Sequence, residues 1–194
     1  MARVALAVAF ILALTGLALI GQGVWIHAKA LLAQVLLERA FVETVATGHH
    51  VKPWPWADTW PVARISVKRL AESAIVLAGS SGQALAFGPG HVEWTPEAGE
   101  RGVAVYSAHR DTHFRFLQDV AIGDEIAVTR SDGATFHYRV EGTSVVRFDE
   151  SGIDPLANGR ALVLSTCWPF GGVTPGPLRY LVHATLIEAG AGHA

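Results

Sequence analysis

The sequence predicts an all-β domain, a sandwich or a barrel, that follows an apolar N-terminal segment. From residue 63 onward, short apolar runs with β-favouring residues alternate with turns rich in Gly and Pro. Before that point, residues 4–26 carry no charge. A chain of 194 residues is long enough for one domain with a sizeable core and this additional segment.

Charge and cysteine content exclude two further features. The formal net charge is -2 at pH 7, so nothing indicates a basic surface for nucleic acid, and no nucleic-acid partner is expected. Cys167 is the single cysteine, so the fold is not held by an intramolecular disulfide.

Residues 4–26 predict a membrane-spanning helix. At about 1.5 Å per residue, the run is long enough to cross a hydrocarbon core of roughly 30 Å. It is longer than the apolar region of a usual signal peptide, and no clear small-residue cleavage site follows it. We therefore expect an uncleaved signal anchor over residues 1–27. Basic residues on its two sides nearly balance, so it is the short N-terminal tail that favours an N-in, C-out orientation.

Residues 28–62 predict a juxtamembrane amphipathic helix and then an extended linker. Apolar residues recur at helical spacing up to about Gly48. Residues 52–61 contain three prolines, which block regular structure, and three tryptophans. Indole rings there would anchor the linker to the domain surface or to the membrane interface.

Residues 63–188 hold the predicted β-domain, and residues 189–194 are expected to form a frayed tail. The expected strands cover residues 64–68, 74–78, 102–107, 124–130, 135–140, 145–148, 161–165 and 178–187. An Asp-Gly pair at 132–133 predicts a hairpin turn between two of them.

Cys167 lies where a predicted buried strand ends. Residues 161–165 are mostly apolar or β-favouring, and Pro169 prevents continuation because it has no N–H to give to a ladder. A scaffold can hold a side chain rigidly at such a strand end, at the edge of a cleft. The plain alternative is a cysteine packed in the core, where most free cysteines lie.

His109 and Arg179 also lie at or near the ends of predicted strands. Acyl transfer through a cysteine needs a thiolate, an imidazole to share and return the proton, and a donor for the developing oxyanion. Cys167, His109 and Arg179 supply these groups in principle, although spacing alone does not show that they meet.

His109 and His113 form a competing pattern. Four residues apart on a helix, two imidazoles share one face, as in zinc hydrolases. Arg110 stands where those enzymes carry a glutamate, and no further ligand cluster follows. We therefore expect no metal, and interpret His137 and His183 as ordinary strand residues.

These motifs resemble those of the sortase family, whose cysteine motif is Thr-Leu-x-Thr-Cys. Val163 replaces the first threonine, and the other fixed positions match. The matching residues are Leu164, Thr166 and Cys167. His109 in the stretch 108–114 and Arg179 complete an ordered triple. The Trp-rich linker and the Pro-Phe-Gly-Gly run after the cysteine resemble sortases of Gram-negative, proteobacterial type.

The resemblance implies an eight-stranded β-barrel with short helices and a membrane-anchored cysteine transpeptidase. Such an enzyme cleaves an LPxTG-like sorting signal through a thioacyl-enzyme intermediate and transfers the acyl group to an amine. By residue match, Cys167 would be the nucleophile and His109 the general acid and base. Arg179 would contact substrate and oxyanion, Thr166 would be a further substrate contact, and residues 147–159 would line the groove.

The resemblance also implies partners and a location. The expected partners are a protein with a C-terminal LPxTG-like signal, an amine acceptor that the sequence does not identify, and membrane lipid around the N-terminal helix; no cofactor is expected. The expected location is the inner (cytoplasmic) membrane, with a single span and the catalytic domain on the periplasmic side. A cysteine hydrolase that uses water and an inactive sortase-like peptide-binding module remain as alternatives.

Overall fold

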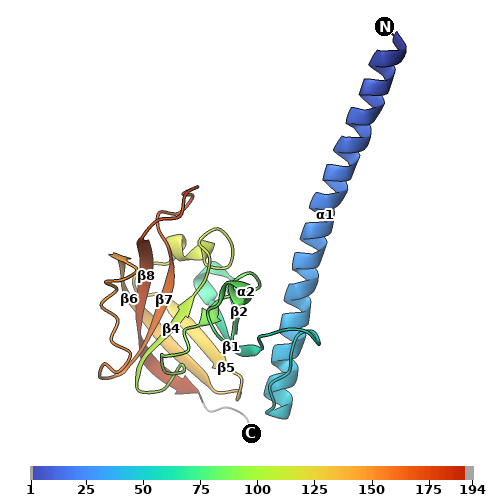
Figure 1. Ribbon diagram of the computed structural model, residues 1–194. Helices are drawn as coiled ribbons and strands as arrows, with labels where there is room; N and C mark the ends of the chain where they lie inside the picture. The colour runs from blue at the N-terminus through green and yellow to red at the C-terminus, as the bar shows by residue number, and fades with distance from the viewer. Residues whose placement is uncertain (1, 191–194) are drawn as a thin grey trace. The chain divides into compact units, whose positions relative to one another are not determined.

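The computed structural model describes residues 2–190, in which eight strands close into a barrel (Figure 1). Their order around the barrel is β1-β2-β3-β4-β7-β8-β6-β5. The bounds are β1 Pro61–Val67, β2 Glu72–Leu77, β3 Gly90–His91, β4 Gly102–Ser107, β5 Glu125–Arg130, β6 Thr135–Arg147, β7 Arg160–Cys167 and β8 Leu178–Gly190. The predicted fold class, an all-β barrel with short helices, is confirmed.

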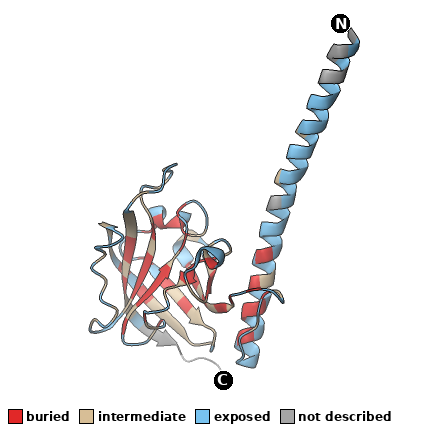
Figure 2. Ribbon diagram, in the orientation of Figure 1, coloured by how far each residue is buried: buried red, intermediate tan, exposed pale blue. Residues whose placement is uncertain are grey.

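The helices are few outside the N-terminal segment. They are α1 Ala2–Thr47, α2 Gly82–Leu85 and the 3-10 helices η1 Lys68–Leu70 and η2 Arg115–Asp119. Within the described residues, α1 is the one helix that is long and apolar enough to cross a membrane; an 18-residue window in it has a mean hydropathy of 1.9. Between Leu6 and Val35, most of the large apolar side chains that the structure describes are exposed (Figure 2). The expected change from membrane helix to juxtamembrane helix near residue 27 is not marked by a break, because α1 is continuous there.

The last turns of α1 belong to the barrel domain. The chain divides into two compact units, and the second one begins at Leu37. Leu37 and Phe41 are buried in a small cluster of their own. The other members are Ile75 and Leu77 of β2 and Ala84 of α2, with Phe87 packed against them. Arg64 of β1 forms an ion pair with Glu38, and its guanidinium lies 4.8 Å from the Phe41 ring centroid.

The main core fills the inside of the barrel. β1 alternates buried and half-buried positions along its whole length, which is the two-residue period of a strand with one face inward. Phe114 closes the core from the connection between β4 and β5, and Tyr138 is the largest fully buried side chain. The buried positions concentrate on the barrel strands in Figure 2.

The outer face of β4, β7 and β8 is apolar as well. Val105, Val163 and Leu181 form a second buried cluster, against which Ile153 of the β6–β7 connection packs. These strands are therefore covered on both faces, one by the core and one by a loop. That is why the segments 102–107 and 161–165 contain nearly continuous apolar runs instead of alternating ones.

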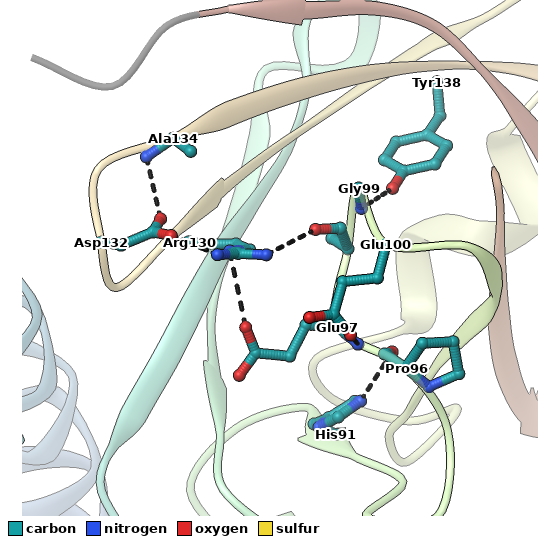
Figure 3. Close-up of polar contacts among 10 residues, drawn as sticks. His91, Pro96, Glu97, Gly99, Glu100, Arg130, Asp132, Ala134 and Tyr138 are labelled. Carbon is teal, nitrogen blue, oxygen red and sulfur yellow. Dashed lines mark hydrogen bonds and ion pairs between the residues drawn. The ribbon is translucent and has the colours of Figure 1, made fainter.

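A polar cluster fastens the β3–β4 connection at the end of the barrel where β5 turns into β6. Figure 3 shows the Arg130 guanidinium between Glu97 and Asp132, with Glu97 Oε2 at 3.5 Å from Nε. The Tyr138 hydroxyl accepts a hydrogen bond from the Gly99 amide at 2.6 Å. Because this connection leads into the first residue of β4, the cluster lies at the opposite end of β4 from His109.

Three strand predictions are corrected. The segments 135–140 and 145–148 form one strand, β6, because bulges near His137 and Gly142 absorb the break in the pattern. The two-residue strand β3 has no counterpart among the expected strands. β8 extends to Gly190, which pairs with Thr135, so residues 189 and 190 belong to a strand and not to a tail; residues 191–194 lie outside the described residues.

Candidate active site

Three neighbouring strands bring the predicted residues to one edge of the barrel. β4 runs parallel to β7, with Ser107 opposite Ser165. β7 runs antiparallel to β8, with Cys167 directly opposite Arg179. His109 follows Ser107 by the same two residues by which Cys167 follows Ser165. The register therefore places His109 and Arg179 on the two flanks of Cys167.

Hydrogen bonds extend the β4–β7 pairing as far as His109. The Ala108 amide donates to the Ser165 carbonyl at 3.2 Å, and the Thr166 hydroxyl donates to the Ala108 carbonyl at 2.7 Å. Thr166 is buried, whereas His109 is exposed and Cys167 half-buried. The Thr166 side chain thus holds the backbone before His109 by donating its hydroxyl proton there, and the expected contact of Thr166 with substrate stays a prediction.

Cys167 lies at the end of a hollowed outer face. Side chains alternate along a strand, so Cys167 shares the outer face of β7 with Val163, and Arg179 shares that of β8 with His183. A cavity of about 310 Å³ lies between this face and the β6–β7 connection. Its lining includes Val103, Val163 and His183 from the strands, and Ile153 and Asp154 from the connection.

His183, interpreted from the sequence as an ordinary strand residue, lies in β8 and also lines this cavity. Its Nε2 lies 2.8 Å from the Ser144 hydroxyl of β6. Desolvation by burial lowers the pKa of His183, which favours the neutral ring near pH 7. The alternating position opposite Val163 is a signal that could have revealed it, since both residues face outward in register.

Arg179 keeps donors available beside the cysteine. Its Nη1 donates to the carbonyls of Gly176 and Leu178, at 3.0 and 2.9 Å. Its guanidinium lies 5.6 Å from the ring centroid of Phe148, within cation–π range. Among residues 2–190, no carboxylate forms an ion pair with Arg179, so Nε and Nη2 could bind an acceptor from outside the chain.

Arg110 is a site residue that sequence reasoning missed. Its side chain is 7% exposed, and its Nη2 donates to the carbonyl oxygens of Gly172 and Thr174. The guanidinium therefore ties the turn after His109 to the connection that follows Cys167. A Cβ on Gly172 would lie 3.2 Å from both terminal nitrogens, so the glycine leaves the space that the arginine occupies.

Aromatic rings hold the start of that connection on β8. Trp168 and Tyr180 stack with centroids 5.6 Å apart, and Phe170 packs edge-on against Tyr180 at 5.2 Å. The Trp168 amide donates to the Leu178 carbonyl at 3.0 Å. Cys167 is thus followed by a packed segment and not by a free loop.

The zinc alternative loses its geometric basis. Residues 109–114 form turns, so His109 and His113 are not one helical turn apart on a helix face. Burial, and then the nearby His109, lower the pKa of His113. Within the part of the chain that the structure describes, no three His, Cys, Asp or Glu side chains form a metal-binding group.

Comparisons with known proteins point to one family. A protein-family model described as "Sortase domain" matches residues 65–187. Sortase D of Bacillus subtilis (strain 168) is 30% identical over 120 residues, which are 61% of this chain and 60% of that protein. The match thus spans less than two thirds of that curated relative.

Solved structures of similar fold include sortases of other organisms. Sortase E from Streptomyces avermitilis is 29% identical with a TM-score of 0.57, over 67% of this chain and 90% of that one. Sortase A from Corynebacterium diphtheriae is 26% identical with a TM-score of 0.60, over 69% of this chain and 63% of that one.

Proposed function

This chain belongs to the sortase family, and on that basis we propose that it is a cysteine transpeptidase that acts on proteins carrying a sorting signal. The observation that supports this most is the placement of Cys167 between two strands, with His109 beyond the end of one and Arg179 on the other. A thiol, an imidazole and a guanidinium are the three groups that such acyl transfer requires.

The reaction would proceed in two balanced steps. The Cys167 sulfur attacks the scissile carbonyl, the C–N bond breaks, and His109 delivers the thiol proton to the leaving amine. An acceptor amine then attacks the thioester, the C–S bond breaks, and a proton passes from the amine through His109 back to the sulfur. Arg179 would donate to the carbonyl oxygen as it becomes negative in both steps.

The substrate would approach along the outer face of β7. The 310 Å³ cavity under the β6–β7 connection has apolar walls, with Val163 on its strand side and Ile153 on its loop side. Such walls suit the Leu-Pro part of an LPxTG-like signal. The Thr carbonyl would then lie toward the strand end, beside Cys167 and Arg179. Thr166 would contribute through Ala108 by fixing the backbone before His109.

The proposed setting is a single-pass membrane protein. Residues 1–27 would span the inner (cytoplasmic) membrane with lipid around them. Residues 28–62 would follow the span, with the helix turns from Leu37 packed on the catalytic domain, residues 63–188, on the periplasmic side. The apolar composition and length of α1 support a span. The Gram-negative class assignment remains a prediction based on the Trp-rich linker and residues 169–172.

Mass spectrometry of the intact protein tests this proposal. The protein is mixed with a peptide containing Leu-Pro-Glu-Thr-Gly, with and without an added amine. We expect an acyl adduct on Cys167 and, with the amine, a product in which it replaces the glycine. Products formed with water alone would favour a hydrolase. Binding without any adduct or cleavage would favour an inactive peptide-binding module.

A further inference from the structure

A second cavity lies on the His109 side of the candidate site. It has a volume of about 300 Å³, and its lining is shared by the turn after His109, helix η2 and the connection after Cys167. The lining residues are Arg110, Asp111, Arg115, Gln118, Phe170 and Gly171. Arg110 follows His109 directly in the chain, and Phe170 and Gly171 lie three and four residues after Cys167.

The walls of this cavity carry excess positive charge and hydrogen-bond donors. Arg110 and Arg115 supply two guanidinium groups against one carboxylate, Asp111. That carboxylate is exposed and lies 3.6 Å from the Arg110 Nε, beyond normal hydrogen-bond length. The buried Arg110 Nη1 has no partner in the described residues, so the charge of this side chain is only partly compensated.

Arg115 provides a donor that a ligand can reach directly. It is exposed, and among the described residues it takes part in no ion pair. Gln118 adds an amide on the same wall, and Phe170 a ring. A planar guanidinium beside an amide N–H suits a carboxylate, which can accept from both. The partly compensated Arg110 behind them adds a favourable field in a recess, where field lines concentrate.

We propose that this cavity is the acceptor subsite, and that it selects amines that carry a carboxylate. The inference rests on the proposed function. In the second step the acceptor amine gives up its proton by way of His109, so the acceptor must approach the thioester from the His109 side. The cavity begins one residue beyond His109. An acceptor whose carboxylate binds Arg115 would hold its amine toward the thioester, and the reaction would form the C–N bond as the C–S bond breaks.

The test compares two acceptors that differ only in their far end. Triglycine ends in a carboxylate and triglycinamide in a neutral amide, while their α-amines are alike. With the full-length chain in detergent and the Leu-Pro-Glu-Thr-Gly peptide, we measure the ratio of amine product to hydrolysis product. We expect triglycine to exceed triglycinamide by about tenfold, the scale of one charge-assisted hydrogen bond. In Arg115→Gln the two should become equal, with peptide cleavage retained.

Arg139→Gln is the matched control, because it removes one exposed arginine from β6, outside the cavity lining. It should keep the wild-type preference. Equal use of both amines by the wild-type protein would overturn the proposal, and so would the same loss of preference in both variants.

A binding measurement tests the acceptor subsite independently of peptide cleavage. Amide chemical shifts of Gly171 and Arg115 are followed while triglycine or triglycinamide is added to the isotope-labelled full-length chain in micelles. Saturable shifts with triglycine alone, lost in Arg115→Gln, support the subsite even if the peptide is not cleaved. Equal shifts with both amines, or none with triglycine, overturn it. Failure of peptide cleavage by itself would instead overturn the proposed function.

Discussion

Arg179 is a half-buried cation whose hydrogen bonds, among residues 2–190, go to backbone carbonyls. A guanidinium that needed only neutralisation would pair with a carboxylate, yet Nη1 binds the carbonyls of Gly176 and Leu178, which fixes the plane of the group. The Phe148 ring restrains it from another direction. The side chain is therefore oriented before any ligand arrives, as an oxyanion donor should be.

Replacing Arg179 tests whether its oriented guanidinium acts as the oxyanion donor. Arg179→Lys keeps the charge but loses the planar pair of donors, so we expect normal folding and a fall in kcat/KM of about 100- to 1000-fold. Alkylation of Cys167 by a small reagent should continue, because the thiol is untouched. The measurements are peptide turnover, a thermal melt and the alkylation rate. Turnover near that of the wild type would remove Arg179 from the mechanism.

The two histidines after β4 should differ sharply in how much turnover depends on them. His109 is exposed beside Cys167, whereas His113 is partly buried with a lowered pKa. We expect His109→Ala to lose at least about a hundredfold in turnover, the usual scale for a general acid–base group. His113→Ala should lose far less, and chelators should have no effect. Comparable losses at both positions together with chelator inhibition would restore the zinc hypothesis.

At the scale of elements, the site depends on how two connections are fastened together. The Thr166 hydroxyl ties β7 to the backbone before His109, and Arg110 ties the backbone after His109 to the segment that follows Cys167. Both flanks of the imidazole are thus fixed to the strand that carries the thiol. Strand pairing aligns β4 with β7, and these two side chains hold the segments beyond the strand ends in place.

Arg110 and Gly172 can be tested as a pair. Arg110→Met removes the bonds to two carbonyls, and Gly172→Ala puts a methyl group 3.2 Å from the guanidinium nitrogens and 3.1 Å from the Pro169 carbonyl oxygen. We expect both variants to speed amide hydrogen exchange in residues 171–176 and to lower turnover, and Arg110→Met to lose about 1.5–3 kcal/mol of stability. The two substitutions should be less than additive when combined, because they disturb one contact.

Gly176→Ala is the control in the same connection, since a Cβ there would meet only the Trp168 carbonyl at 3.8 Å. Its exchange rates and turnover should match those of the wild type. Equal effects of the alanine at both glycines would mean that the whole connection is sensitive, and that Arg110 has no special part in holding it.

The strands differ in how well the sequence predicted them. The strand before Cys167 was predictable, because an apolar run ends at a cysteine and a proline stops it. β3 was not, because its two residues, Gly90–His91, are strand only through pairing with β2 and β4, which no local pattern records. The roles of Arg110 and the outward-facing His183 were missed for a related reason. Their partners, such as Gly172 and Ser144, are distant in sequence and are brought near only by the closed barrel.

At the scale of the whole molecule, the barrel domain includes part of the N-terminal helix. Leu37 and Phe41 are almost fully buried against β2 and α2, and the Val51 amide donates to the Thr44 hydroxyl at 3.1 Å. The helix therefore has two kinds of residue. The described residues before Leu37 are mostly exposed and apolar, which suits lipid, whereas the last turns complete the packing of the barrel domain.

Two truncated chains test which part of α1 the barrel domain needs. A chain that begins just before Leu37 lacks the apolar span but keeps the buried helix turns, so we expect it to be soluble, to melt as the full-length protein does, and to cleave peptide. A chain that begins at Lys52 lacks Leu37 and Phe41 and exposes the apolar surface of β2. Burial of two such side chains is worth about 3–6 kcal/mol, so this chain should melt at a lower temperature and aggregate more readily.

Full-length Phe41→Ala should share the lower melting temperature, and Val35→Ala, at an exposed position on the same helix, should not. If the chain from Lys52 proves as stable and active as the chain from Leu37, the last turns of α1 are no part of the catalytic domain, and the domain begins with the barrel itself.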